Sequence, residues 1–294
     1  MEKIIEKAAT LVEAFPYIRS FRDKVVVVKY GGSTQPEEGG SDTVLADLVF
    51  METVGMRPVV VHGGGKEISR RLEEAGVASK WVNGLRVTDE EAMAVVEDTL
   101  FGVVNRRIAE GIEALDGSAR GMSAKDAGIL YVNQHFALIE EGGKTEKLDI
   151  GFVGDVERVD PDPIRMACEE ETIPVITPVG LGPDGKSYNV NADTAAGEIA
   201  RALQAEKLVF LTDVNGIIRD GSDPESLIST LHINDVDALV DTGTISGGMI
   251  PKLQACVRSV KGGVHKTHII DGRVSHALLL EIFTREGIGT EIVQ

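Results

Sequence analysis

The sequence has few cysteines, no long apolar run and fewer basic than acidic side chains. Its 294 residues include only Cys168 and Cys256, which lack metal-site spacing, so we expect each to fill a buried small-residue position. No run of 18 or more apolar residues occurs, which excludes a membrane-spanning helix. The first residues are acidic and amphipathic, without the apolar core of a signal peptide. A reduced, cytoplasmic setting is therefore expected.

The charge balance limits the partners that the surface can attract. The chain carries 47 acidic and 30 basic side chains, a net charge of −17. Such a surface repels nucleic acid and anionic membranes, so neither is expected as a partner. An anionic substrate would need a local basic site within an acidic molecule.

Short apolar runs alternate with helical periodicity along most of the chain. The β-branched runs that predict buried strands are 25–28, 58–61, 173–176, 208–211 and 268–270. The helical patterns cover 2–20, 41–55, 65–75, 89–114, 164–171, 192–204, 234–241 and 249–260, with Pro16 expected to end or kink the first. This alternation predicts a three-layer αβα sandwich with a mainly parallel open central sheet.

The middle of the chain has a different character. Residues 119–160 hold short alternating segments around a charged turn, which predicts a β-hairpin layer over one end of the sheet. Prolines punctuate 160–184, where we place a lobe boundary. The expected division is a helical extension at 1–22, an N-terminal lobe at 23–180 and a C-terminal lobe at 181–294.

Two lysines beside glycine pairs are the most informative motifs. Lys29 ends an apolar run and precedes Gly31-Gly32, and Lys252 follows Gly247-Gly248 near a predicted helix start. Glycines let backbone N–H groups approach phosphate oxygens, and lysines supply positive charge. The alternatives are a surface turn after a strand for Lys29 and a solvated surface lysine for Lys252.

A third glycine segment, His62-Gly63-Gly64-Gly65, also joins a strand to a helix start, where anions are favoured. It is not a Walker A loop, because Val60 stands where the first glycine belongs and Glu67 replaces the Ser or Thr that holds Mg²⁺. His62 by itself fits a hydrogen-bonded structural histidine better than a base or a ligand.

Three polar segments leave their roles open on pattern alone. Arg86, after the turn Asn83-Gly84, suits either a carboxylate clamp or a surface salt bridge. Asn189, Asn191 and Asp193 could cap a helix or form a polar hub that orients lysines and substrate. The strand and turn at 208–216 could line a nucleotide pocket.

Taken in order, these segments resemble the amino acid kinase family, and within it the acetylglutamate branch. The resemblance covers nearly the whole chain from about residue 25, and 83–89, 189–196 and 247–252 in this order are specific for the branch. The sequence departs from the usual pattern of this branch at 33–40 and at Lys66-Glu67, where the branch more often has Pro-Gln. Neither departure removes a residue with an assigned role.

The resemblance implies ATP-dependent phosphorylation of the γ-carboxylate of N-acetyl-L-glutamate, in arginine biosynthesis. A carboxylate is ionised near pH 7, so no general base is needed. The implied catalytic residues are Lys29, Lys252 and Asp193, and the implied substrate-binding residues are Gly64, Gly65, Arg86 and Asn189. The implied ATP-binding residues are Gly31, Gly32, Leu211, Thr212, Asp213, Gly216, Thr244 and Ser246. Mg²⁺ would be carried mainly by the ATP phosphates, with no metal-binding side chains. The N-terminal lobe would bind acetylglutamate and dimerise, and the C-terminal lobe would bind ATP.

The N-terminal extension resembles that of arginine-inhibited members, in which an added helix joins dimers into a hexamer, a trimer of dimers. Tyr17, His268, Glu281 and Gly287 match the feedback site for L-arginine. Whether a PII-type signalling protein binds is left open.

Two alternative functions remain. One is a related kinase that acts on an aminoadipate derivative or aspartate, and the other is a catalytically weak regulator that binds nucleotide and arginine.

Overall fold

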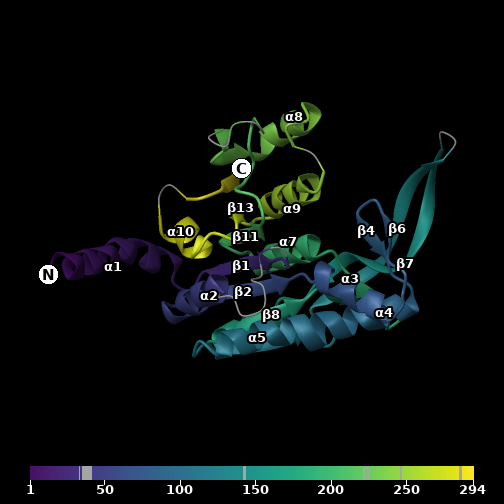
Figure 1. Cartoon of the computed structure of the whole chain (residues 1–294), viewed down its shortest axis with the longest axis horizontal. Coiled ribbons are helices and arrows are strands. Elements are labelled where there is room, and N and C mark those ends of the chain that lie inside the picture. The colour runs from purple at the N-terminus through teal and green to yellow at the C-terminus, as the bar shows by residue number, and fades with distance from the viewer. Residues whose placement is uncertain are drawn as a thin grey trace.

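A mainly parallel sheet forms the centre of the molecule (Figure 1). The structure, a computed structural model, describes residues 1–32, 34, 42–141, 144–220, 223, 226–245, 247–284 and 287–294, without the side chains of residues 2–4, 6–8, 10, 11, 141 and 144. Within these residues eight strands form the sheet, in the order β12 (Thr230–His232), β14 (Thr290–Val293), β13 (Lys266–Asp271), β11 (Lys207–Thr212), β1 (Val25–Tyr30), β2 (Arg57–His62), β8 (Ile173–Thr177) and β5 (Ala119–Ser123). All neighbouring strands pair in parallel except β13 and β14.

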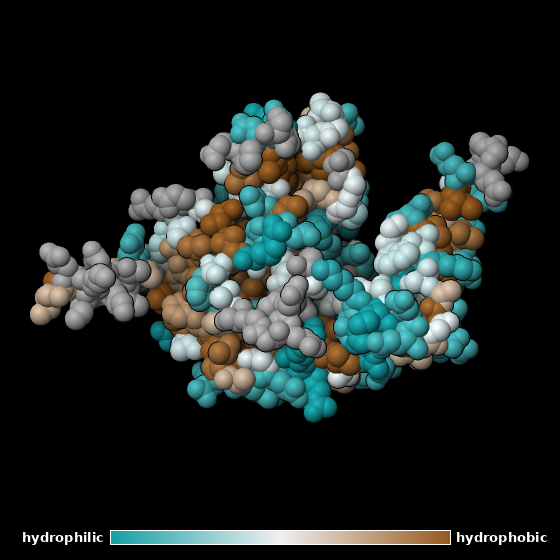
Figure 2. Space-filling view, viewed as in Figure 1, coloured by the Kyte–Doolittle hydropathy of each residue, from teal (hydrophilic) through white to brown (hydrophobic). Residues whose placement is uncertain are grey.

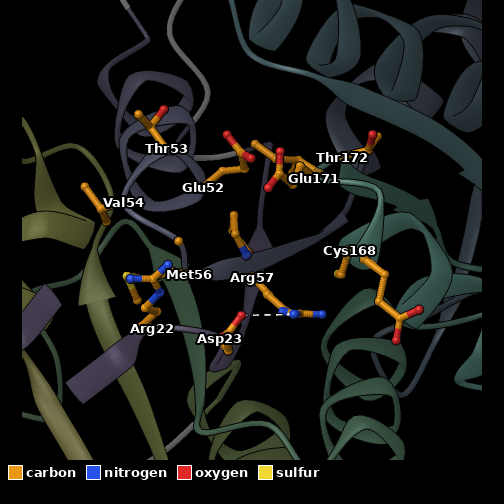
Figure 3. A pocket seen from close by; sticks show the side chains of 14 residues that line it. Arg22, Asp23, Glu52, Thr53, Val54, Met56, Arg57, Cys168, Glu171 and Thr172 are labelled. Carbon is orange, nitrogen blue, oxygen red and sulfur yellow. Dashed lines mark hydrogen bonds and ion pairs between the residues drawn. The ribbon is translucent and has the colours of Figure 1, made fainter. Parts of the chain in front are cut away.

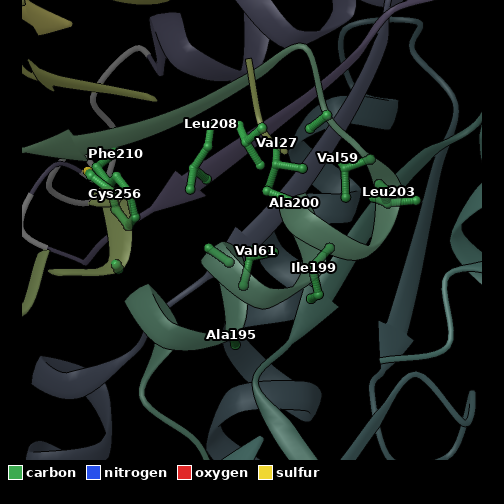
Figure 4. Packing of buried hydrophobic residues seen from close by; sticks show 14 of the residues in the cluster. Val27, Val59, Val61, Ala195, Ile199, Ala200, Leu203, Leu208, Phe210 and Cys256 are labelled. Carbon is green, nitrogen blue, oxygen red and sulfur yellow. The ribbon is translucent and has the colours of Figure 1, made fainter. Parts of the chain in front are cut away.

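Helices cover both faces of this sheet, and alternating residues of each strand supply the two cores. Val27, Val59 and Phe210 pack on the face covered by α6 (Asp162–Glu169), α7 (Ala192–Leu203) and α9 (Met249–Lys261), as Figure 4 shows for α7. Val28 and Val60 pack on the other face, against α2 (Thr43–Thr53), α5 (Arg106–Glu113) and α10 (Ala277–Phe283). Each fully buried valine contributes about 1.5–3 kcal/mol. The predicted three-layer αβα sandwich is confirmed.

The helical stretch predicted at 89–114 is continuous but not uniform. It consists of α4 (Glu90–Glu97), a π-helical segment η1 (Asp98–Asn105) and α5. Asp89 caps α4, because its carboxylate accepts a hydrogen bond from the Ala92 N–H at 2.9 Å. Hydrophobic periodicity does not distinguish one π-turn within such a run from α-helix.

The hairpin predicted in the middle of the chain is present, but it is shorter than 119–160. Strands β6 (Leu130–Glu141) and β7 (Lys144–Val159) form a long hairpin that closes a small barrel with β9 (Val179–Leu181) and β10 (Ser187–Asn189). The hairpin projects from the body at the end away from the N-terminus (Figures 1 and 2). Residues 119–123 belong to the main sheet instead, as edge strand β5. Their sequence, Ala-Arg-Gly-Met-Ser, lacks the β-branched run typical of a buried strand.

The N-terminal helix α1 (Glu2–Phe21) runs through Pro16, so the proline does not end it. This helix contacts α10 and points away from the body (Figure 1). Its apolar side chains Ile5, Val12 and Phe15 are 60%, 73% and 60% exposed, so the helix does not simply pack on its own chain. The remaining elements are α3 (Gly65–Glu74), β3 (Lys80–Val82), β4 (Leu85–Val87), η3 (Ile233–Asp235) and α8 (Val236–Asp241).

The two cysteines differ in burial. Cys256 is fully buried, as expected, whereas Cys168 is only partly buried, and both are free thiols. Within the part of the chain that the structure describes, no helix combines the length and apolarity needed to cross a bilayer.

Candidate active site

The predicted site residues converge at the carboxyl ends of the central strands, the edge where open α/β sheets bind ligands. Lys29 is the penultimate residue of β1, and Gly31 and Gly32 follow that strand. Gly64 and Gly65 follow β2, and helix α3 begins at Gly65. Parallel pairing of β1 with β2 therefore brings the two glycine segments side by side.

Asp193 holds both lysines. Its Oδ1 lies 3.0 Å from the Lys29 Nζ, and its Oδ2 lies 2.6 Å from the Lys252 Nζ. The side chains are 11%, 11% and 23% exposed for Asp193, Lys29 and Lys252. Burial acts to raise the pKa of Asp193, but the two ammonium groups outweigh it and lower that pKa. Burial also lowers the pKa of Lys29, while Asp193 opposes this shift. The surface alternatives for both lysines are wrong.

Local sequence explains why Asp193 is available for the lysines. Asn191 is the helix cap of α7, accepting hydrogen bonds from the N–H groups of Asp193 and Thr194 at 2.9 and 3.0 Å. Asp193 lies in the first helical turn, where a carboxylate is favoured by the helix dipole. Lys252, in the first turn of α9, is disfavoured by that helix's own dipole, and the ion pair with Asp193 offsets this cost.

A cavity of about 230 Å³ opens beside these groups. Its wall contains Lys29, Asp193 and Gly32 together with all four predicted substrate residues, Gly64, Gly65, Arg86 and Asn189. Asn189 reaches it from the end of β10. The structure therefore brings the predicted catalytic and substrate-binding residues into one place.

Arg86 is held rigidly at the wall of this cavity. It is 5% exposed, its Nη2 donates to the Ser69 hydroxyl at 2.7 Å, and its Nη1 donates to the Ser79 hydroxyl. Its guanidinium carbon lies 4.4 Å from the centre of the Trp81 ring, a cation–π contact. No carboxylate of the described residues forms an ion pair with it, so the surface salt-bridge alternative is wrong. An ordered, unpaired guanidinium suits an anionic ligand.

The predicted nucleotide residues lie mostly outside this cavity. Leu211 is buried in the core at the end of β11, and the Thr212 hydroxyl bonds backbone groups of Val214 and Ile270. Asp213 and Gly216 follow in the next turn, and Thr244 lies before α9. Gly31 is buried where β1 ends. Ser246 and the departing segment 33–40, apart from Thr34, fall outside the described residues.

The predicted feedback residues cluster around α10. The His268 Nδ1 donates to the Glu281 carboxylate at 2.6 Å, and burial lowers the pKa of that histidine. Glu281 also accepts a hydrogen bond from the Ile288 N–H at 2.8 Å, and Gly287 lies directly beside its carboxylate. Tyr17 reaches the same helix from α1, with its ring 6.4 Å from that of Phe283.

Sequence reasoning missed several residues that support these clusters. Ser69, Ser79 and Trp81 hold Arg86, and Lys207 donates to the His268 Nε2 at 3.1 Å. Ser69 could have been found, because it lies one helical turn after Gly65. Ser79 and Trp81 carry no local signal, since only the β3–β4 hairpin brings them to Arg86.

A larger cavity of about 540 Å³ lies at the opposite, amino-terminal edge of the strands (Figure 3). The ion pair between Arg57 and Asp23, 3.0 Å long, crosses it, and Glu52 and Glu171 line it. Burial and the nearby Glu171 raise the pKa of Glu52. None of the predicted site residues contributes to this cavity, so it does not belong to the lysine–aspartate centre.

Comparison with known proteins shows the family of the chain. The model of the amino acid kinase family matches residues 24–271. The acetylglutamate kinase of Heliobacterium modesticaldum is 52% identical over 295 residues, covering 100% of both chains. That of Moorella thermoacetica is 50% identical over 98% of both chains.

Among solved structures, N-acetylglutamate synthase from Neisseria gonorrhoeae, complexed with coenzyme A and N-acetyl-glutamate, is similar with a TM-score of 0.82 and 28% identity. The match covers 98% of this chain and 63% of that one, so the chain spans somewhat under two thirds of the synthase. The chain belongs to the amino acid kinase family, in its acetylglutamate kinase branch.

Proposed function

We propose that the chain transfers the γ-phosphoryl group of ATP to the γ-carboxylate of N-acetyl-L-glutamate, a step of arginine biosynthesis. The observation that carries the proposal is the centre formed by Lys29, Asp193 and Lys252 beside a cavity lined by Arg86, which forms no ion pair with a carboxylate of the described residues. Two lysines ordered by one carboxylate match the main demand of phosphoryl transfer, which is positive charge around a moving phosphate. The acetylglutamate kinases at about 50% identity support the choice of substrate.

In the proposed step, a γ-carboxylate oxygen attacks the γ-phosphorus of ATP in line with the leaving group. One O–P bond forms, the bond between that phosphorus and the β,γ-bridging oxygen breaks, and ADP leaves with the electron pair. The acceptor is already ionised near pH 7, so no proton has to be removed. Lys29 and Lys252 stabilise the charge on the moving phosphoryl group, and Asp193 keeps both ammonium groups in place.

Acetylglutamate would occupy the 230 Å³ cavity. Arg86 would bind a carboxylate of the substrate through its guanidinium, Gly64 and Gly65 would present backbone N–H groups, and Asn189 would hydrogen-bond the acyl amino acid. The first turn of a helix leaves its N–H groups without intrahelical acceptors, and α3 begins at Gly65. This supports anion binding at that point.

ATP would lie on the C-terminal-lobe side, with Gly31 and Gly32 at its phosphates. The residues proposed to surround the nucleotide are Leu211, Thr212, Asp213, Gly216, Thr244 and Ser246. Among the described residues, no group of three or more acidic, histidine or cysteine side chains lies close enough together to hold a metal ion. Mg²⁺ is proposed to be carried mainly by the ATP phosphates, where it would neutralise their charge.

L-Arginine is proposed as a feedback inhibitor that binds near Tyr17, His268, Glu281 and Gly287. The N-acetylglutamate synthase of Neisseria gonorrhoeae, also solved with coenzyme A and L-arginine, supports arginine recognition by a related fold. The buried Glu281 carboxylate offers a partner for a guanidinium or ammonium group.

The exposed apolar side chains of α1 support its role as an assembly helix that joins dimers into a trimer of dimers. The proposed division is the extension 1–22, a dimerising, acetylglutamate-binding lobe at 23–180 and an ATP-binding lobe at 181–294. A cytoplasmic location completes the proposal, and binding of a PII-type protein is left open.

The proposed reaction is tested by incubating the purified protein with Mg-ATP and an acceptor, and trapping acyl phosphate with hydroxylamine. N-Acetyl-L-glutamate, free glutamate and N-acetyl-aminoadipate are compared in parallel. Hydroxamate from N-acetyl-L-glutamate alone is expected. Preference for N-acetyl-aminoadipate would change the substrate, and ATP binding without any hydroxamate would favour a regulator.

A further inference from the structure

A buried polar network lies directly beneath the glycine segment that follows β2. At its centre is Asn105, 1% exposed, the last residue of the π-helical segment η1. Its Nδ2 lies 2.8 Å from the Val175 carbonyl oxygen, 3.1 Å from the His62 Nε2 and 3.1 Å from the Thr177 Oγ1. His62 and Thr177 are both fully buried. The amide therefore joins the carboxyl ends of two neighbouring strands, β2 and β8.

The partners of His62 determine which of its nitrogens carries the proton. The Nδ1 lies 3.1 Å from the Gly63 carbonyl oxygen, which can only accept, so the proton is assigned to Nδ1. The Nε2 then accepts from the Asn105 amide. Burial lowers the pKa of His62 to about 4, so the imidazole is neutral near pH 7. A neutral ring with a hydrogen bond at each nitrogen fixes the end of β2 without acting as a base.

Both strand ends held by Asn105 lead directly into the proposed substrate cavity. Gly63, Gly64 and Gly65 follow His62, and Pro178 follows Thr177, and all four residues line that cavity. Because these residues are covalently next to the network, a shift of His62 or Thr177 moves the cavity wall.

The same π-helical segment also contacts the glycine loop through apolar atoms. A Cβ added to Gly64 would lie 2.6 Å from the Leu100 Cδ2, so a larger residue there would require Leu100 to shift. Leu100 and Asn105 are five residues apart. In an α-helix that spacing would place them about 140° apart around the axis. The i→i+5 bonding of a π-helix brings positions five apart closer together around the axis, so Leu100 can contact Gly64 while Asn105 reaches His62 and Thr177.

The sheet is also shaped to accept the amide. A Cβ on Gly121, in strand β5, would lie 2.3 Å from the Asn105 Oδ1. The edge strand therefore leaves room for Asn105 by having no side chain at this position.

We propose that Asn105 is a positioning residue for phosphoryl transfer, which acts through His62 and Thr177 to hold the Gly63–Gly65 loop at the acyl amino acid. This inference rests on the proposed function. It assigns the π-turn a purpose: the turn places Leu100 against Gly64 and the Asn105 amide against the ends of the two strands, β2 and β8, that lead into the cavity. Misplacement of a positioning group by about 1 Å can reduce turnover about 100-fold.

The test measures kcat and both KM values for Asn105→Leu, which is similar in size but cannot donate. Thr99→Val is the matched control, because Thr99 is also fully buried in η1 but donates only to the Val95 carbonyl oxygen, at 2.6 Å. We expect Asn105→Leu to lower kcat about 10- to 100-fold with the KM for ATP within twofold of wild type. The control should lose thermal stability but keep kcat within twofold. If Asn105→Leu is not folded, Asn105→Ser is measured against the same limits.

A double-mutant cycle with His62→Leu separates positioning from general destabilisation. If Asn105 acts through His62, the double variant should turn over no more than about threefold slower than the worse single variant. A folded Asn105 variant with kcat within threefold of wild type, an equal loss in Thr99→Val, or multiplying losses in the cycle would each overturn the inference. Wild-type enzyme that forms no acyl phosphate would instead overturn the proposed function, and this inference with it.

Discussion

Replacement of Asp193 by asparagine keeps the shape of the side chain but removes the carboxylate that contacts Lys29 and Lys252. The two contacts are 3.0 and 2.6 Å long. At an effective dielectric constant of 20, each unit pair at about 3 Å is worth about 5 kcal/mol before the cost of burying the charges is subtracted. Without the carboxylate the two ammonium groups repel each other and lose their common anchor.

The expected losses of activity and of stability are similar in free energy. We expect kcat for Asp193→Asn to fall about 100- to 1000-fold, the effect of losing one preorganised electrostatic contact. The free energy of unfolding should fall by about 3 kcal/mol, the lower end for a broken buried ion pair. The loss is moderated because the Lys252 side chain is 23% exposed and can turn toward solvent.

Steady-state kinetics at saturating ATP and acetylglutamate, with thermal unfolding alongside, measure both effects. Glu198→Gln is the matched control: it makes the same charge change on the same helix and breaks only an ion pair with Arg201 at the helix surface. It should keep kcat within twofold. An Asp193→Asn enzyme that is folded and turns over within fivefold of wild type would refute the role assigned to Asp193.

Three further predictions follow from other parts of the molecule. Arg86→Gln should raise the KM for N-acetyl-L-glutamate at least tenfold and leave the KM for ATP within twofold, because Arg86 lines the cavity proposed for the acyl amino acid. Equal changes in both KM values would contradict this. His62 should contribute about 1.4 kcal/mol per pH unit to the fall in unfolding free energy as the pH decreases from 6.5 to about 4, because the unfolded His62 binds a proton that the folded chain excludes. Denaturant titrations at several pH values measure this slope, and a His62→Gln chain with the same slope as wild type would exclude that origin. Deletion of residues 1–20 should abolish inhibition by L-arginine while turnover is retained. Unchanged arginine sensitivity in the truncated enzyme would contradict the proposed feedback inhibition.

The fold could be predicted largely because its central strands are buried on both faces. Runs such as 25–28 and 208–211 are continuous and β-branched, a pattern typical of parallel strands covered by helices. Strand β5 was missed because it is an edge strand without such a run. The helix at α10 and the short strand β14 also lie in segments with weak periodicity, and they are stabilised by contacts with β13 and α2.

The candidate site could be predicted where its residues lie close to one another in the sequence. A lysine two residues before a glycine pair indicates a phosphate contact, whereas the pattern around Asn191 and Asp193 fits a helix cap as well as a polar hub, and its role was implied only by the family resemblance. The supports of Arg86 could not be recognised, because Ser69 and Trp81 come from different elements and meet only in the folded chain. The same holds for Asn105, which is 43 residues from His62. Its amide gives no signal in a helical pattern that continues past it.

In the proposed reaction the acceptor carboxylate takes the phosphoryl group from ATP without an intermediate on the protein, between Lys29 and Lys252. A single-turnover experiment tests this step: enzyme in excess is mixed with γ-labelled ATP and N-acetyl-L-glutamate, and the label is followed over time. We expect the label to pass from ATP to acyl phosphate in one phase and never to reside on the protein. Label that appears first on the protein, or that is released only to water, would contradict it.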